Sequence, residues 1–385
     1  MTNEELLEEK RLKDRFNKII ELFNYKYVKA NTKSKKELIA RDLFSIADIC
    51  EKYFPQFKFD ISWNKDIELY NQGILSCYKF IDNIIINKDK YFNIFNSSMY
   101  NVLRLKINDY KYYEKNLPRH KEKELDYIFC SFLNDFDSKT YKEYLNMIDK
   151  ENIFYTPSLT KNGTNYTFTI LNDNMIFLNS LYKSNINFYE TLAHELGHSL
   201  EAKLYLNSGK EREFNSTMNS PFYEVPSSFM EYAYINYLIE NNIYKEEAEI
   251  ILYDYYMELL VNTMYSNIIC QISNIESKLD ENMNINLETY GKYLDKLKID
   301  YNLYSIPIYK RISLIEPFIY GFGQLFSIYL YENYKKDPIY FKKEFSKSLL
   351  EYSQTEDMSS FESVGINYDE LVKGDTLKKV LTRNS

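Results

Sequence analysis

The amino-acid sequence predicts a mainly α-helical protein with two helical lobes and one small β-hairpin or sheet. Three observations support this fold class. Apolar residues recur at three- and four-residue steps along most of the chain, which is the spacing that lines one face of a helix. Only residues 165–178 have the composition of strands. Hydrophobic residues make up 45% and aromatic residues 17% of the 385 residues, which provides a sizeable core and excludes intrinsic disorder.

The first part of the chain, residues 4–153, has a helical pattern almost throughout. One helix start is marked by Ser34 and Glu37, a capping-box pair whose side chains bind backbone N–H groups left free at a helix N-terminus. Further amphipathic runs are predicted over residues 66–86, 91–114 and 122–149. We therefore predict two domains, an N-terminal helical lobe at 1–152 and a second domain at 153–385.

The hairpin is predicted next to this boundary. Residues 165–171 are rich in Tyr, Thr, Phe and Ile, residues 172–174 have a typical turn sequence, and residues 175–178 return as an apolar strand. Helices are expected to resume at about Phe188. Interruptions are expected at residues 207–209, 219–221 and 301–307.

The most apolar long segment, residues 313–331, approaches the length of a membrane span. It contains Glu316, Pro317 and Gln324, which would be costly in hydrocarbon. We therefore predict a buried core helix and expect no membrane partner.

Charge and cysteine content exclude further classes of protein. The chain has 48 Lys and Arg against 56 Asp and Glu, a net charge of −8, which argues against nucleic acid and anionic lipid as partners. The four cysteines form no CxxC or CxxH pair and are typical of free thiols in a reducing compartment. Residues 1–18 lack the apolar stretch of a secretory signal. We therefore expect a cytoplasmic location.

Two of the three histidines, His194 and His198, belong to the sequence His-Glu-Leu-Gly-His, an HExxH motif. Asn187 with Glu190 resembles the N-terminal cap of a helix. Apolar residues repeat every four positions through the motif, at Phe188, Leu192, Leu196 and Leu200. The sequence therefore predicts that the motif lies on a helix.

Residues four apart on a helix are only about 40° from eclipsed, so both imidazoles project from one face and can bind one metal ion. Imidazole ligands with an open position favour Zn²⁺. Glu195 points to the side, where its carboxylate can meet a metal-bound water as a general base. The alternative is a pair of surface histidines on a charged helix, and the residues downstream argue against it.

Catalytic zinc needs a third protein ligand. The metzincin pattern requires Gly at position 201 and His at position 204, but the chain has Glu201 and Leu204, which excludes that class. A second helix is predicted at residues 222–231, where Glu224 and Glu231 are seven residues apart and share a face. One of these carboxylates can bind the metal while the other accepts the N–H of a ligating imidazole.

The HExxH motif followed by Glu224-Val225-Pro226-Ser227 resembles the thimet oligopeptidase and oligoendopeptidase F family of zinc peptidases. The resemblance covers roughly residues 155–385. It implies two lobes around a substrate cleft and a catalytic domain at 153–385. It also implies one Zn²⁺ per chain bound by His194, His198 and Glu224, with Glu195 activating water and Glu231 supporting the site.

The sequence departs from this family in two respects. Family members carry a His in a C-terminal I-P-H-F segment, whereas Ile308 follows Ile306-Pro307 here. Tyrosines in the same region of the family polarise the scissile carbonyl, and the candidates are Tyr304, Tyr309 and Tyr320, with Tyr320 preferred. The N-terminal lobe is also shorter than is usual in the family.

These observations predict a zinc-dependent endopeptidase that hydrolyses short, unstructured peptides. The predicted hairpin offers an edge strand on which an extended peptide would align. Two alternatives stay open: a zinc-retaining, peptide-binding or chaperone-like protein with little turnover, suggested by Ile308, and a dedicated leader or processing peptidase, suggested by the short lobe. The substrate preference and the oligomeric state do not follow from the sequence.

Overall fold

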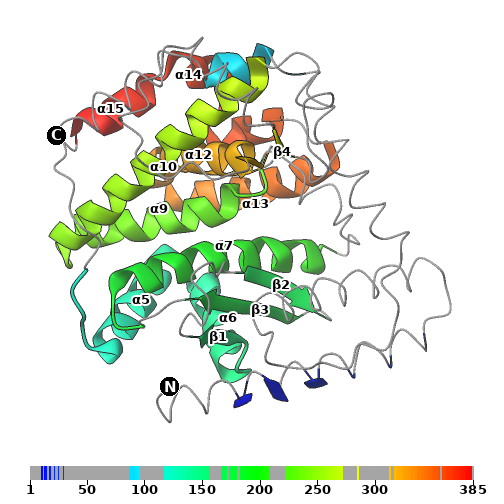
Figure 1. Ribbon diagram of the computed structural model, residues 1–385, viewed down its shortest axis with the longest axis vertical. Coiled ribbons are helices and arrows are strands. Elements are labelled where there is room, and N and C mark those ends of the chain that lie inside the picture. Colours follow the sequence, from blue (N-terminus) through cyan, green and yellow to red (C-terminus); the bar gives the residue numbers. More distant parts are fainter. Residues whose placement is uncertain are drawn as a thin grey trace. The chain divides into compact units, whose positions relative to one another are not determined.

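The computed structural model describes residues 87, 89–95, 117–156, 166–170, 173–179, 183–208, 222–271, 284–285, 312–313, 316–355 and 358–383, with several residues between 10 and 29 (Figure 1). This part of the chain is mainly helical, which confirms the predicted mainly α-helical class. The two lobes around a substrate cleft stay a prediction. The predictions for residues 34–37, 66–86 and most of 91–114 lie outside the described residues.

The chain divides into two compact units. The first comprises Met1–Leu75 and Pro118–Lys203, and the second comprises Ser76–Leu117 and Leu204–Ser385. The domain boundary predicted near residue 152 lies between a helix and a strand of the first unit and stays a prediction.

The elements of the first unit are helices α5 (Glu122–Phe136) and α6 (Ser138–Asp149), strands β1 (Ile153–Thr156), β2 (Tyr166–Ile170) and β3 (Asp173–Asn179), and helix α7 (Ile186–Asn207), whose last turn passes into the second unit. The elements of the second unit are α9 (Val225–Glu240), α10 (Lys245–Gln271), β4 (Asn284–Ile285), β5 (Ile312–Ser313), α12 (Glu316–Lys336), α13 (Pro338–Thr355), a 3₁₀ helix (Met358–Val364), α14 (Tyr368–Lys373) and α15 (Asp375–Arg383).

The amphipathic run predicted over residues 122–149 is two helices, because the chain turns at Asp137. This residue has extended backbone angles, and its carboxylate accepts hydrogen bonds from the backbone N–H groups of Lys139 and Thr140 at 3.1 Å. An Asp in this position is a favourable N-cap, since it satisfies donors that have no partner inside the helix. The apolar periodicity continues across the break, and so the periodicity alone does not reveal it.

The three strands of the first unit form one sheet in the order β1-β3-β2. Strands β2 and β3 pair antiparallel, with Ile170 opposite Asp173, and both lie within the region predicted to form the hairpin. The turn predicted over residues 172–174 is wrong in its extent, because Asp173 and Asn174 already pair with β2 as part of β3. Strand β1 pairs parallel with β3, with Ile153 opposite Ile176. Strand β1 was not predicted, since its four residues follow a helical pattern without a turn signal.

Helix α7 lies along one face of this sheet (Figure 1). Asn174 on β3 is buried, and its side-chain amide donates hydrogen bonds to the backbone oxygen and the hydroxyl of Ser199, at 2.6 and 2.9 Å. Tyr189 donates to Asp126 on α5 at 2.7 Å. These bonds attach both halves of α7 to neighbouring elements, so the helix that carries the HExxH motif is held along its length.

The residue predicted to cap the N-terminus of this helix, Asn187, is the wrong one. Asn187 lies inside the first turn of α7, and the side-chain oxygen of Asn185 accepts the backbone N–H of Phe188 at 3.1 Å. The helix therefore starts two residues earlier than the Asn187–Glu190 pattern indicates.

Helix α9 forms the core of the second unit and packs against α10 and α12. Almost all of its residues are buried, which is typical of a helix that is covered on all sides. Phe229 packs on Phe341 and Phe345 of α13, with ring centroids 5.3 Å apart in both pairs. Helix α9 is thereby held between three other helices.

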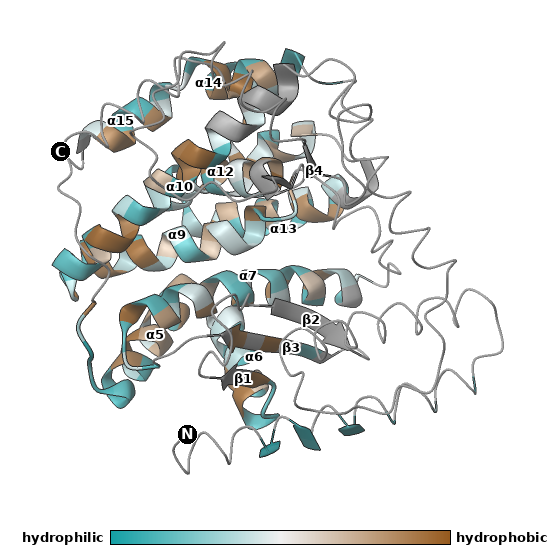
Figure 2. Cartoon of the chain, viewed as in Figure 1, coloured by the Kyte–Doolittle hydropathy of each residue, from teal (hydrophilic) through white to brown (hydrophobic). Residues whose placement is uncertain are grey.

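Helix α12 confirms the buried core helix predicted over residues 313–331, although it begins at Glu316 and continues to Lys336. None of the helices within the described ranges combines the length and the apolar character needed to cross a membrane. The amphipathic pattern is clear in α15, where apolar and polar residues alternate along the helix (Figure 2). Its apolar residues are buried and occur at helical spacing, at Leu377, Val380 and Leu381.

Candidate metal centre

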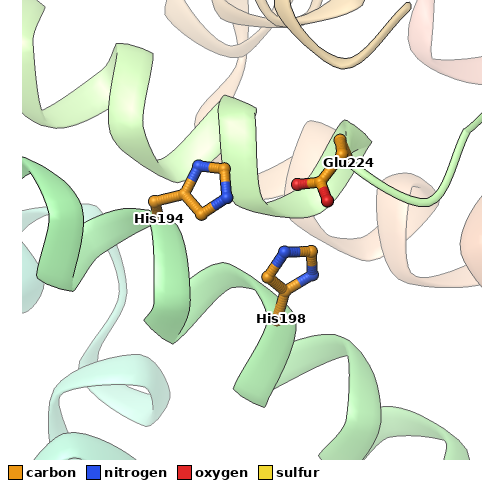
Figure 3. Close-up of side chains that lie close together, drawn as sticks. All are labelled: His194, His198 and Glu224. Carbon is orange, nitrogen blue, oxygen red and sulfur yellow. The ribbon is translucent and has the colours of Figure 1, made fainter. Parts of the chain in front are cut away.

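The two histidines of the motif lie one turn apart on α7. Their ring centroids are 5.2 Å apart, with the ring planes at 78° to each other. His194 is half-buried and His198 is 8% exposed. Both imidazoles extend from the same side of the helix, as their four-residue spacing predicts (Figure 3).

Glu224 lies in the turn that precedes α9. It is the N-cap residue of this helix, and the backbone N–H of Val225 bonds to the oxygen of Phe222 at 3.1 Å. The helix predicted over residues 222–231 therefore starts at Val225, and Glu224 stands just before it. Pro226 occupies the first turn, where a residue without an N–H costs no hydrogen bond.

This turn is anchored by an aromatic cluster. The centroid of the Phe222 ring lies 5.1 Å from the ring centroids of Phe322 and Phe326 of α12. It lies 4.9 Å from that of Tyr352 of α13 and 5.8 Å from that of Phe361. Packing on several sides leaves the turn little freedom. The position of Glu224, two residues later, follows from this packing.

The three residues predicted to bind zinc lie close together. Each of His194, His198 and Glu224 offers a ligand atom, and these atoms all lie within 4.8 Å of one another. Figure 3 shows the three side chains pointing toward a common point, with the imidazoles extending from α7 and the carboxylate from the turn before α9. Within the described residues, neither Glu195 nor Glu231 belongs to this group.

The donor set fits a zinc ion. Tetrahedral zinc bonded at about 2.0–2.2 Å to nitrogen and oxygen donors separates its ligand atoms by about 3.3–3.6 Å. Ligand atoms that lie within 4.8 Å of one another are compatible with this spacing. Two imidazoles and one carboxylate are also a typical set of protein ligands for catalytic zinc, which leaves a fourth position open.

Ser227 belongs to the Glu-x-Pro-Ser segment, but no role was predicted for it. Its side chain is fully buried, and its hydroxyl donates a hydrogen bond of 2.7 Å to Oε2 of Glu224. The same hydroxyl lies 3.0 Å from the backbone oxygen of Glu224. The bond restrains the rotation of the carboxylate, and the spacing of Glu and Ser by three residues at a helix start was the signal that could have revealed it.

We expect the Ser227→Ala variant to bind zinc about 10–100-fold more weakly, because the loss of an outer partner leaves the ligand carboxylate less well oriented. The measurement is the zinc dissociation constant by competition with a chromogenic chelator. Ser227→Thr keeps the hydroxyl and serves as the conservative variant. Ser228→Ala removes a neighbouring hydroxyl that has no hydrogen-bond partner among the described residues, and it should leave the affinity unchanged. Equal affinities in Ser227→Ala and the wild type would contradict this role.

Glu195 and Glu231 are both buried, with 4% and 9% of their surface exposed. Glu195 lies on α7 between the two histidines in sequence. Glu231 lies on α9, and burial together with the charge of Glu231 raises the pKa of Tyr255 well above its ordinary value. Carboxylates are rarely this buried unless they are paired or lie near a cation. Each of these two carboxylates is therefore expected to have a hydrogen-bonding or cationic partner.

Of the three candidate tyrosines, Tyr320 alone lies within the described residues. Tyr320 lies on α12 and is half-buried. Tyr304, Tyr309 and the Ile306-Pro307-Ile308 segment lie outside the described residues. The oxyanion role of all three tyrosines stays a prediction.

No protein-family model matches this chain, and no curated protein does. Solved structures do resemble it. PZ peptidase A with inhibitor 2 is 13% identical with a TM-score of 0.51, over 100% of this chain and 78% of that one. A protein described as a peptidase from Chlamydophila abortus is 11% identical with a TM-score of 0.50, over 90% of this chain and 61% of that one.

A protein described as an oligoendopeptidase F, from Bacillus anthracis str. Ames, is 14% identical with a TM-score of 0.49, and the aligned parts are 91% of this chain and 63% of that one. The chain thus spans less than two thirds of the length of two of these three structures. At such low identity the comparison establishes the fold alone. The resemblance drawn from the motif residues is therefore confirmed at the level of the fold: this chain has the mainly α-helical fold of PZ peptidase A and of the Chlamydophila abortus protein.

Proposed function

We propose that this chain is a zinc-dependent endopeptidase that hydrolyses short, unstructured peptides. The observation that carries the proposal is the convergence of ligand atoms from His194, His198 and Glu224 to within 4.8 Å of one another. The fold shared with PZ peptidase A agrees with the proposal. Because one fold hosts many functions, the argument for the function rests on the site.

In this proposal His194, His198 and Glu224 hold one zinc ion. A bound zinc ion lowers the pKa of a water molecule to about 7 and polarises a carbonyl oxygen. Glu195 accepts a proton from the water that attacks the peptide carbonyl, and it later gives this proton to the leaving amine. A C–O bond forms and the peptide C–N bond breaks, so the products are a carboxylic acid and an amine. General-base catalysis of this kind contributes about 10²–10⁴-fold to the rate.

Two further roles belong to the proposal. Glu231 accepts the N–H of a ligating imidazole and so fixes its tautomer and orientation. A tyrosine donates a hydrogen bond to the oxyanion that develops on the carbonyl oxygen. We prefer Tyr320 over Tyr304 and Tyr309 for this role, because it lies on α12, the helix that packs against α9, where Glu224 caps the first turn.

Metal removal tests the proposal directly. The purified protein is expected to contain one zinc ion per chain by mass analysis and to cleave a quenched-fluorescent peptide. A chelator abolishes the cleavage, and added zinc restores it. A zinc content near one without chelator-sensitive cleavage of any peptide pool would favour a peptide-binding protein instead.

Length-matched peptide libraries separate a general oligopeptidase from a dedicated processing peptidase. Cleavage of many short sequences is expected. Cleavage confined to one sequence would favour the processing peptidase.

A further inference from the structure

Gly323 on α12 lies unusually close to the backbone of Glu224. A Cβ atom built on Gly323 would come 2.6 Å from the backbone oxygen of Glu224, 2.8 Å from its carbonyl carbon and 2.7 Å from Oγ of Ser228. Real Cβ atoms essentially never approach another heavy atom to less than 3.0 Å. The backbone of α12 therefore packs directly on the first turn of α9, at the residue that offers the metal a carboxylate.

The peptide group of Glu224 has little freedom to move away from α12. Its oxygen accepts the backbone N–H of Ser228 at 3.0 Å, which is the first hydrogen bond of α9. The Ser227 hydroxyl lies 3.0 Å from the same oxygen. The ring of Phe222 is meanwhile packed on Phe322 and Phe326, the residues of α12 on either side of this contact in sequence. A side chain at position 323 would thus push against atoms that several other contacts hold in place.

We propose that Gly323 is a positioning residue of the metal centre. Because it has no side chain, α12 can lie against the peptide group of Glu224 and set the place from which the carboxylate reaches the two imidazoles. The proposal rests on the proposed zinc site and deepens it. Gly323 itself touches neither metal nor substrate in this account and acts only through Glu224.

Gly321, on the same helix, provides a matched control. A Cβ built there would meet the ring of Phe95 at 3.4 Å and Cβ of Asn262 at 3.5 Å, which are ordinary or nearly ordinary contacts. Alanine raises the helix propensity at both positions in the same way. Gly321→Ala and Gly323→Ala therefore differ chiefly in what the added methyl group meets.

The experiment measures the zinc dissociation constant of folded variants by chelator competition, and the visible absorption of the Co²⁺-loaded proteins, which reports the ligand geometry. We expect Gly323→Ala to weaken zinc binding at least about 10-fold and to change the Co²⁺ spectrum, as the loss of outer support to a ligand does. Gly321→Ala should keep the wild-type values. Wild-type affinity and spectrum in Gly323→Ala would overturn the proposal.

A second variant separates the backbone contact from the side-chain contact. In the double variant Gly323→Ala with Ser228→Ala, the Oγ atom at 2.7 Å is gone, but the Glu224 oxygen at 2.6 Å remains. We expect the double variant to bind zinc as weakly as Gly323→Ala. Restored affinity would show that the methyl group acts by pressing on Ser228, and it would overturn the assignment of Glu224 as the residue positioned.

A variant that is less stable but unchanged at the metal centre serves as a further control. Leu377→Ala, a core change in α15, is expected to lower the melting temperature without changing zinc affinity. If Gly323→Ala does not fold, the double variant with Ser228→Ala, which lacks the Oγ contact at 2.7 Å, is measured in its place. A zinc affinity at least about 10-fold weaker than that of Ser228→Ala alone is then expected, and an unchanged affinity in the folded double variant would overturn the proposal.

The two proposals fail in different ways. A wild-type chain that binds no zinc would remove the proposed function, whatever Gly323 does. Tight zinc binding by the wild type and equally tight binding by Gly323→Ala would remove only the role of Gly323.

Discussion

The Glu195→Gln variant is expected to lose peptide hydrolysis by about 10²–10⁴-fold in kcat/KM while it keeps one zinc ion per chain. Glutamine has nearly the shape of glutamate but cannot accept a proton from water. Glu195 is also not one of the three residues whose ligand atoms converge, so its amide should leave the metal in place. The measurement pairs zinc content with cleavage of a quenched-fluorescent peptide.

Glu190→Gln is the matched control for this prediction. Glu190 lies on the same helix, α7, and the substitution removes the same charge from it. Its kcat/KM is expected to stay close to that of the wild type. Full activity in Glu195→Gln with zinc still bound would exclude Glu195 as the general base, and with it the proposed mechanism.

The Glu224→Ala variant is expected to lose zinc affinity by more than the roughly 100-fold that removal of an outer partner costs, because a ligand to the metal itself is gone. Two imidazoles would remain on α7, and they alone do not form the three-ligand set of catalytic zinc. Peptide cleavage should fall to background at zinc concentrations that saturate the wild type. The dissociation constant is measured by chelator competition.

The control for this change is Glu246→Ala, which removes an exposed carboxylate from the first turn of α10. Its zinc affinity should equal that of the wild type. Near-normal zinc binding by Glu224→Ala would mean that the ion is held elsewhere. The convergence in Figure 3 would then have no bearing on metal binding.

Local patterns in the sequence predicted the elements that depend on neighbours along the chain. The placement of His194 and His198 on one helix face follows from a four-residue spacing and the 3.6-residue turn, whatever surrounds the helix. The paired strands β2 and β3 lie where alternating and β-branched residues flank a turn sequence. The buried helix α12 follows from its long apolar segment, which polar residues make unsuitable for lipid.

Features that depend on packing were missed or misplaced. Strand β1 exists because β3 offers it an edge, and four residues carry no periodicity that distinguishes a strand from the end of a helix. The break at Asp137 and the cap at Asn185 are set by single side-chain hydrogen bonds. Polar caps occur in loops as well, so composition identifies them only together with the backbone geometry.

For the candidate site, the sequence by itself determined which chemical groups are present. These are two imidazoles one helical turn apart, a glutamate between them, and a Glu-x-Pro-Ser segment downstream. Only the tertiary structure decided that Ser227 holds the carboxylate of Glu224 and that Gly323 abuts its peptide group. The physical reason is that spacing along a helix is a local property of the backbone. The approach of two segments distant in sequence depends on how their side chains pack.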